Sequence, residues 1–132
     1  MLTLAMASLA LAAAQDLRHE PMRPAVECAE HLTDWRARRG CLDDLLHTAE
    51  DALAAAAEAA EAEAHEIDLD SGGRFGAESA FGVAQTAWFA YRDAECTRRA
   101  ALMFLSAESR EEIELDCRIA LTRSRTAELQ DH

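Results

Sequence analysis

The sequence predicts an all-α fold: a small, disulfide-stapled helical bundle or hairpin with about three main helices. Alanine dominates the apolar half of the chain, and only 5 glycines and 2 prolines interrupt it, which favours helices over a sheet. The chain also carries 4 cysteines in 132 residues. Disulfides would support an alanine-rich core, because alanine buries little apolar surface. The length suits one compact domain rather than two.

The first fourteen residues, MLTLAMASLALAAA, are apolar and uncharged and end in an Ala-x-Ala pattern. They are too few for the ~20 residues of a membrane span, so we predict a signal peptide over residues 1–14 and no span. The usual positive n-region is missing, and an ordinary N-terminal helix is the alternative. Residues 15–27 contain two prolines and are expected to form an extended leader, followed by one helical domain over residues 28–130. No cysteine stands directly after the cleavage site, and Cys28 lies too far along the chain, so we expect no lipid anchor. The signal peptide predicts a location in the periplasm or outside the cell.

The first helical segment is expected to be a short turn capped by Thr33 or Asp34, which Gly40 breaks or bends. From Leu42 onward, apolar residues recur at the i, i+3, i+4, i+7 spacing of an amphipathic helix. This long helix is expected to end near Asp70, because the SGGRFG stretch that follows supplies three glycines.

Two further helices are expected over residues 77–104 and 108–129, joined near Ser106 into an antiparallel hairpin. The sequence SREE, beginning at Ser109, fits a capping box that opens the last helix. In such a hairpin, positions equidistant from the turn face each other.

The cysteines are predicted to form two disulfides, Cys28–Cys41 and Cys96–Cys117. The second pair has its midpoint at the proposed hairpin turn, so its two sulfurs can meet, although four cysteines permit three pairings. Two disulfides fit a short exported chain. Zinc is the alternative, but a structural zinc site usually contains closely spaced cysteines, and the gaps here are longer. The histidines show no ligand spacing either, so we expect no metal and no cofactor.

Acidic residues are concentrated in one segment of the chain. The formal net charge is −12, and the chain contains Arg but no Lys. Residues 40–73 carry ten acids and no Arg. Such a chain is a poor ligand for nucleic acid or an anionic membrane and suits a cationic protein partner. Alternatively, the acidity only keeps the protein soluble. Candidate partner-binding residues are Asp43, Asp44, Glu50, Asp51, Glu58 and Glu61, with Trp35 and Phe89 as candidate anchors.

The stretch QTAWFAYRDAEC concentrates aromatic and charged side chains. On a helix, Gln85, Trp88, Arg92 and Cys96 share one face, which predicts a core layer. Arg92 and Asp93 are expected to point apart and to find partners on other helices. The stretch has no His or Ser to complete a nucleophile–base pair, so we expect no enzymatic activity.

The pattern Q-x-x-W-x-x-Y-R-D-x-x-C, followed by a later Cys and by T-x-x-R-x-x-x-L, resembles the signature of the LprI-like lysozyme-inhibitor N-terminal domain family. The resemblance covers roughly residues 28–130. In the first half, Glu50-Asp51-Ala52-Leu53-Ala54 stands where members often have Asp-x-x-Leu-Asn. We assign the matching residues mainly to structure: Gln85, Trp88, Tyr91, Arg92, Asp93, Cys96, Cys117, Thr122, Arg125 and Leu129.

The resemblance implies a small, helical, exported bacterial protein that inhibits lysozyme by direct binding. Animal-type lysozymes are typically cationic, which agrees with the acidic segment of this chain. The alternative is a helical interaction module of the bacterial envelope that has another partner and does not inhibit lysozyme.

Overall fold

The computed structural model describes residues 23–104 and 106–131, so the predicted signal peptide and most of the leader lie outside the described residues. No strand occurs in the described part, and the predicted all-α fold with three main helices is confirmed. The elements in chain order are α1 (Pro24–Glu27), the 3-10 turn η1 (Ala29–His31), α2 (Trp35–Ser71), α3 (Ala77–Ala101) and α4 (Ala107–Gln130). In these same residues, no helix is both long and apolar enough to cross a membrane.

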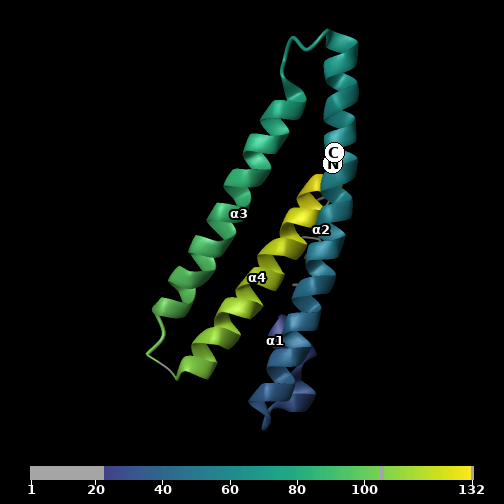
Figure 1. The fold of residues 1–132 in the computed structure, drawn as a ribbon. Helices are drawn as coiled ribbons and strands as arrows, with labels where there is room; N and C mark the ends of the chain where they lie inside the picture. The colour runs from purple at the N-terminus through teal and green to yellow at the C-terminus, as the bar shows by residue number, and fades with distance from the viewer. Residues whose placement is uncertain (1–22, 105, 132) are drawn as a thin grey trace, which may run out of the picture.

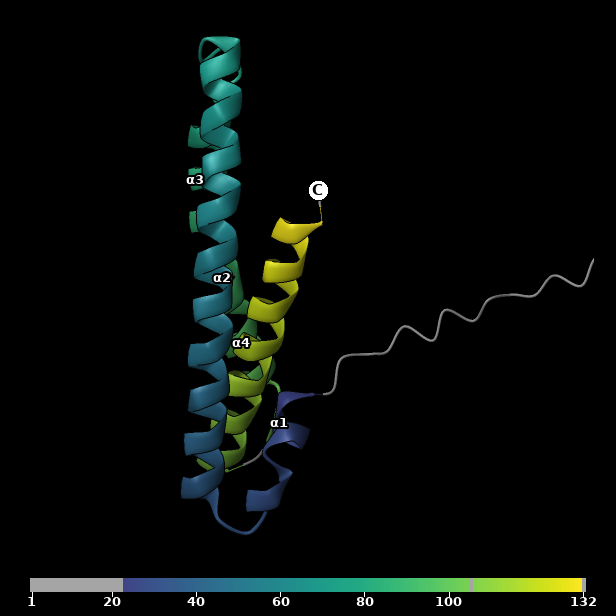
Figure 2. The same cartoon turned by 90° about the vertical axis from the view of Figure 1, so that its right-hand side faces the viewer.

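The three long helices run antiparallel to their neighbours in sequence, and α4 lies between α2 and α3 at one end of the molecule (Figure 1). Turning the molecule shows that α4 ends well short of the α2–α3 turn, while α1 packs beside α4 (Figure 2). Residues 57–84 form the other end of the α2–α3 pair, and none of them is buried. We call residues 57–84 the arm and the rest of the described chain the body.

The apolar core lies in the body. Its central cluster joins Cys28, Leu42 and Ala49 to Ile119 of α4, with Trp35 and three leucines packed around it. Leu42 and Ile119 are fully buried, and each such side chain contributes about 1.5–3 kcal/mol relative to exposure. This core joins α2, α4 and the N-terminal turns within the body. The arm contributes no buried residue to it.

Both predicted disulfides are present. Cys28–Cys41 joins the end of α1 to α2 with a Cα–Cα distance of 5.9 Å, and Cys96–Cys117 joins α3 to α4 with 5.5 Å. Cys28 and Cys96 are fully buried, so each bridge also fills space in the core. The described residues include no free cysteine.

The N-terminal elements differ from the prediction in two ways. Helix α2 begins at Trp35, where Asp34 accepts a hydrogen bond from the Ala37 amide, and it continues through Gly40 without a break. A helix-interior glycine costs about 1 kcal/mol relative to alanine, which the core packing on both sides of it outweighs. In addition, Pro24–Glu27 is helical rather than extended, because the Asp116 carboxylate accepts a 2.7 Å hydrogen bond from the Ala25 amide.

The α3–α4 connection is longer than predicted. Helix α3 ends at Ala101 rather than near Phe104, and α4 begins at Ala107. The cap is Ser106, whose hydroxyl accepts from the Ser109 amide at 3.1 Å, so the capping box predicted to begin at Ser109 is wrong. Ser106 precedes Ser109 by one helical turn and has a non-helical backbone. Its hydroxyl therefore satisfies the Ser109 amide, which has no partner within the helix.

We expect the Cys96→Ala, Cys117→Ala double variant to lose about 3 kcal/mol of unfolding free energy, because the bridge closes a loop of 21 residues. Urea denaturation followed by circular dichroism would measure the loss. An unchanged midpoint would mean that packing of α3 on α4 alone holds the hairpin together.

Candidate functional site

Arg92 lies where α2, α3 and α4 meet. Its Nη1 donates to Glu50 of α2 at 3.0 Å and to the Thr122 hydroxyl of α4 at 3.1 Å, while its Nε donates to Asp93 at 3.0 Å. Only 6% of Arg92 is exposed, and Thr122 is fully buried. One guanidinium therefore joins all three long helices by charge-assisted hydrogen bonds.

Two aromatic rings flank this guanidinium. The Arg92 Cζ lies 5.6 Å from the Trp88 ring centroid and 5.2 Å from that of Phe89, and the two rings meet edge to face at 5.1 Å. Both distances are within the range of cation–π attraction. Arg92 and Asp93 find partners on other helices as expected, since Arg92 reaches Glu50 and Thr122 and Asp93 lies 3.9 Å from Arg118. The expectation that they point apart is wrong, because the long Arg92 side chain also reaches Asp93.

A second polar link joins α3 to α4 further along the pair. Arg125 donates through Nε and Nη2 to the Gln85 side-chain oxygen, both at 3.2 Å, and through Nη1 to Glu128 at 3.0 Å. Leu129 is half-buried near the end of α4, whereas Tyr91 is exposed. Most of the signature residues therefore hold the helices together, and Tyr91 is the one that faces solvent.

The candidate partner-binding residues fall into different environments. Glu50 is engaged by Arg92, and Asp43 lies 3.9 Å from Arg39. Trp35 is half-buried against the core, with the Arg38 Cζ 5.4 Å from its ring centroid. Phe89 is 39% exposed. The remaining candidates are exposed on α2: Asp44, Asp51, Glu58 and Glu61.

Negative charge is densest on the arm. Its 28 residues include seven acids and one Arg, a net formal charge of −6 with His65 neutral. The body has a net charge of −5, from sixteen acids and eleven Arg among 80 described residues. Because most Arg lie in the body, the field of the molecule is uneven along its length.

The end of the arm is held by polar contacts between α2 and α3. The Asp68 carboxylate accepts from the amides of Ala77 and Glu78, at 2.8 and 3.0 Å, and these bonds lower the pKa of Asp68. His65 Nδ1 lies 3.0 Å from the Glu78 carboxylate, and that hydrogen bond raises the pKa of His65 above 6.5. The sequence pattern does not reveal these residues, because the cap of α3 comes from Asp68 of the neighbouring helix α2 rather than from the residue that precedes α3.

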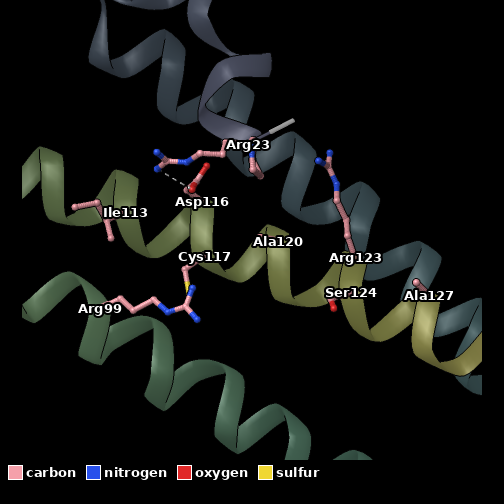
Figure 3. Close-up of a pocket in the computed structure, with 10 residues that line it drawn as sticks. Arg23, Arg99, Ile113, Asp116, Cys117, Ala120, Arg123, Ser124 and Ala127 are labelled. Carbon is pink, nitrogen blue, oxygen red and sulfur yellow. Dashed lines mark hydrogen bonds and ion pairs between the residues drawn. The ribbon is translucent and has the colours of Figure 1, made fainter. Parts of the chain in front are cut away.

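A shallow groove of ≈ 790 Å³ runs along the outer side of α4 (Figure 3). Arg23, Arg99 and Arg123 border it, and alanines with Ile113 and Cys117 supply an apolar lining. Each of the three guanidinium groups already contacts a carboxylate, on Asp116, Glu95 and Glu27 respectively. The groove therefore presents paired rather than unpaired cations.

The three described histidines have partners other than hydroxyl or thiol groups. His31 lies 3.4 Å from Glu30, His47 contacts the Asp43 carbonyl, and His65 pairs with Glu78. All four cysteines are in disulfides. Within residues 23–104 and 106–131, no group of His, Cys, Asp and Glu is placed to hold a metal ion.

Arg92→Ala should lower the unfolding free energy by about 2–3 kcal/mol, since it leaves the buried Thr122 hydroxyl without its donor while Glu50 and Asp93 can still reach water. Urea denaturation would measure this. Arg98→Ala is the matched control, because Arg98 is exposed and Glu95 keeps its ion pair with Arg99, so the loss should stay below about 1 kcal/mol. Equal losses from both variants would remove the special role assigned to Arg92.

His65 should titrate at a higher pKa in the folded chain than in urea. A raised folded-state pKa means that this pair stabilises the folded arm below pH 6.5, and that the contribution is lost as pH rises through the folded pKa. An NMR titration of the imidazole protons would measure both values. Glu78→Gln should remove the difference, and an unaltered His65 titration in that variant would contradict the pairing.

Comparison with known proteins gives one match. A family model described as Lysozyme inhibitor LprI matches residues 27–129, which is more than half of the chain. Comparisons with curated proteins and with solved structures found no match. The matched region spans both disulfides, the Arg92 contacts and the arm. The chain therefore belongs to the lysozyme inhibitor LprI family.

Proposed function

We propose that this protein inhibits a cationic, animal-type lysozyme by binding it directly. Membership of the lysozyme inhibitor LprI family supports this proposal. The observation that carries it is the arm, which has a net charge of −6 and no buried residue. A surface of this kind is available to a partner without any unfolding of the body.

The charge of the arm would act mainly on the rate of encounter. A concentrated negative field attracts a cationic protein over roughly a Debye length, which is about 8 Å at physiological ionic strength. Complementary fields of this kind raise the association rate more than they raise the affinity. Glu58, Glu61 and Glu63 are exposed on the arm and would contribute to this steering, together with Asp44 and Asp51 of the body.

The site of action would lie outside the cytoplasm. Two disulfides are typical of oxidising compartments, and lysozyme acts on peptidoglycan, which also lies outside the cytoplasm. These features support a site of action in the periplasm or the surrounding medium, where the protein would act by binding rather than by catalysis.

A second candidate function is an envelope interaction module with a different partner. Its support is the α3–α4 connection, where Leu102 and Met103 are exposed and Phe104 is fully exposed. This apolar segment lies at the end of the molecule opposite the α2–α3 turn (Figure 1). It would bind an apolar surface rather than a cationic one.

The triple variant Glu58→Gln, Glu61→Gln, Glu63→Gln should associate with animal-type lysozyme about five-fold more slowly at low salt, with little change in dissociation. Surface plasmon resonance at low and moderate ionic strength would measure both rates, alongside the lysis of a peptidoglycan suspension.

The matched control is Glu30→Gln, Glu108→Gln, Asp131→Asn, which changes the net charge by the same amount at exposed positions of the body. Equal slowing in both triple variants would mean that total charge, rather than the arm, attracts lysozyme. Absence of any inhibition by the parent chain would overturn the proposed function and leave the envelope module.

A further inference from the structure

The outer end of the arm carries large apolar side chains as well as charge. We call residues 67–76 the tip, which comprises the end of α2 and the glycine-rich turn into α3. Leu69 is 62% exposed, Phe75 is 72% exposed and Ile67 is about half exposed. Isolated exposed apolar residues are ordinary, but here three occur within nine residues at the end of an arm. Aromatic and apolar side chains that become buried on binding supply most of the affinity of an interface.

The tip also holds the one Arg of the arm. The other basic residue of 57–84 is His65, which pairs with Glu78, whereas Arg74 makes no ion pair with any described residue. Its guanidinium carbon lies 6.0 Å from the Phe75 ring centroid, at the outer limit of cation–π attraction. An Arg beside an exposed aromatic ring is a typical combination at interface hot spots.

Hydrogen bonds constrain the backbone of the tip. Gly72, Gly73 and Gly76 have positive φ, and the Gly73 amide donates to the Asp68 carbonyl at 2.7 Å. The Asp68 carboxylate holds the first two amides of α3, as described above. A preorganised tip loses little conformational entropy when it binds, which favours affinity.

The tip is also the part of the molecule with the least around it. It lies beyond the end of α4 and away from α1 in both views (Figures 1 and 2). A narrow, convex projection of this kind fits a concave binding site, because ligand sites in enzymes are clefts with apolar walls and a few polar groups.

The chemistry of a lysozyme cleft matches this arrangement. Glycoside hydrolases use two carboxyl groups that flank the scissile bond, ~5–5.5 Å apart in retaining enzymes. An acidic pair inside an otherwise cationic enzyme would attract Arg74, whereas the cationic exterior would attract exposed acids such as Glu66 and Asp70. The tip and the acids beside it place one cation among negative charges, whereas such an enzyme places two acidic groups among positive charges.

We propose that the tip of the arm, through Leu69, Arg74 and Phe75, enters the substrate cleft of lysozyme and is the anchor of the complex. This inference rests on the proposed function. Phe75 and Leu69 pack against the apolar walls of the cleft, and Arg74 lies against the catalytic carboxyl groups. The neighbouring acids, Glu66 and Asp70, contact the cationic rim. Inhibition is therefore competitive with the glycan.

The experiment measures inhibition of animal-type lysozyme on a soluble chitin-derived oligosaccharide, for the oxidised parent chain and four variants. Phe75→Ser should weaken inhibition at least ~10-fold and Arg74→Gln about five-fold. The matched controls are Phe104→Ser and Arg36→Gln, which alter an exposed Phe and an exposed Arg at the other end of the molecule. Both controls should stay within about two-fold of the parent. Melting temperatures and elution volumes check the folding and the oligomeric state of the parent and of every variant.

The outcomes separate the two proposals. If the parent inhibits and Phe75→Ser inhibits equally well, or if inhibition is not competitive, the tip is not the anchor and the proposed function stands. If the parent does not inhibit, the proposed function fails and the cleft assignment fails with it. If the parent is a dimer that Phe75→Ser dissociates, the tip is a self-association surface, which also overturns the assignment.

Discussion

The hydrogen bonds of Arg92 hold the body together. This guanidinium comes from the middle of α3 and reaches Glu50 on α2 and Thr122 on α4, two positions far away in sequence. A buried charge is costly unless it is paired and hydrogen-bonded, so each of the three helices is restricted to the place where Arg92 finds its partners. The Cys96–Cys117 bridge lies one helical turn further along the same face of α3 and forms a second, covalent link between α3 and α4.

The buried residues and the densest exposed charge lie in different parts of the molecule. The body has the buried residues, both disulfides and most of the Arg, while the arm has acidic and exposed apolar residues and no buried one. The arm keeps its shape through local polar contacts, chiefly the Asp68 cap and the His65–Glu78 pair. Substitutions on its surface should therefore change binding with little effect on folding, since surface changes away from caps are usually within about ±0.5 kcal/mol.

Some misplaced predictions have a common physical origin. Gly40 was expected to interrupt a helix and Pro24–Glu27 to be extended, because local propensities favour those states. In the folded chain, core packing carries α2 through Gly40, and Asp116 of α4 supplies a hydrogen bond to the N-terminal turn. Partners that are distant in sequence decided both cases, and a local pattern contains no information about them.

In the candidate site, too, local spacing predicts some roles and contacts between distant residues decide others. The sequence predicts a mainly structural role for the signature residues, and the contacts of Arg92, Gln85 and Thr122 agree with that role. Glu50 was grouped with the partner-binding acids, yet it is engaged by Arg92, and its place on the acidic helix could not reveal this. The exposed tip was not singled out, because SGGRFG is recognisable from sequence only as a turn.

By itself, the sequence determined the helical class, the segregation of acidic residues and the family signature. Each of these depends on residue identity and on spacing along one helix or across one turn. Only the tertiary structure decided that α4 ends short of the α2–α3 turn and leaves Leu69, Arg74 and Phe75 at an unsupported end (Figure 2). Helix lengths do not fix this outcome. The side-chain contacts of α4 with α2 and α3 set where it packs along them, and these contacts join residues from 17 to 74 positions apart, such as Thr97 with Glu114 and Arg38 with Glu112.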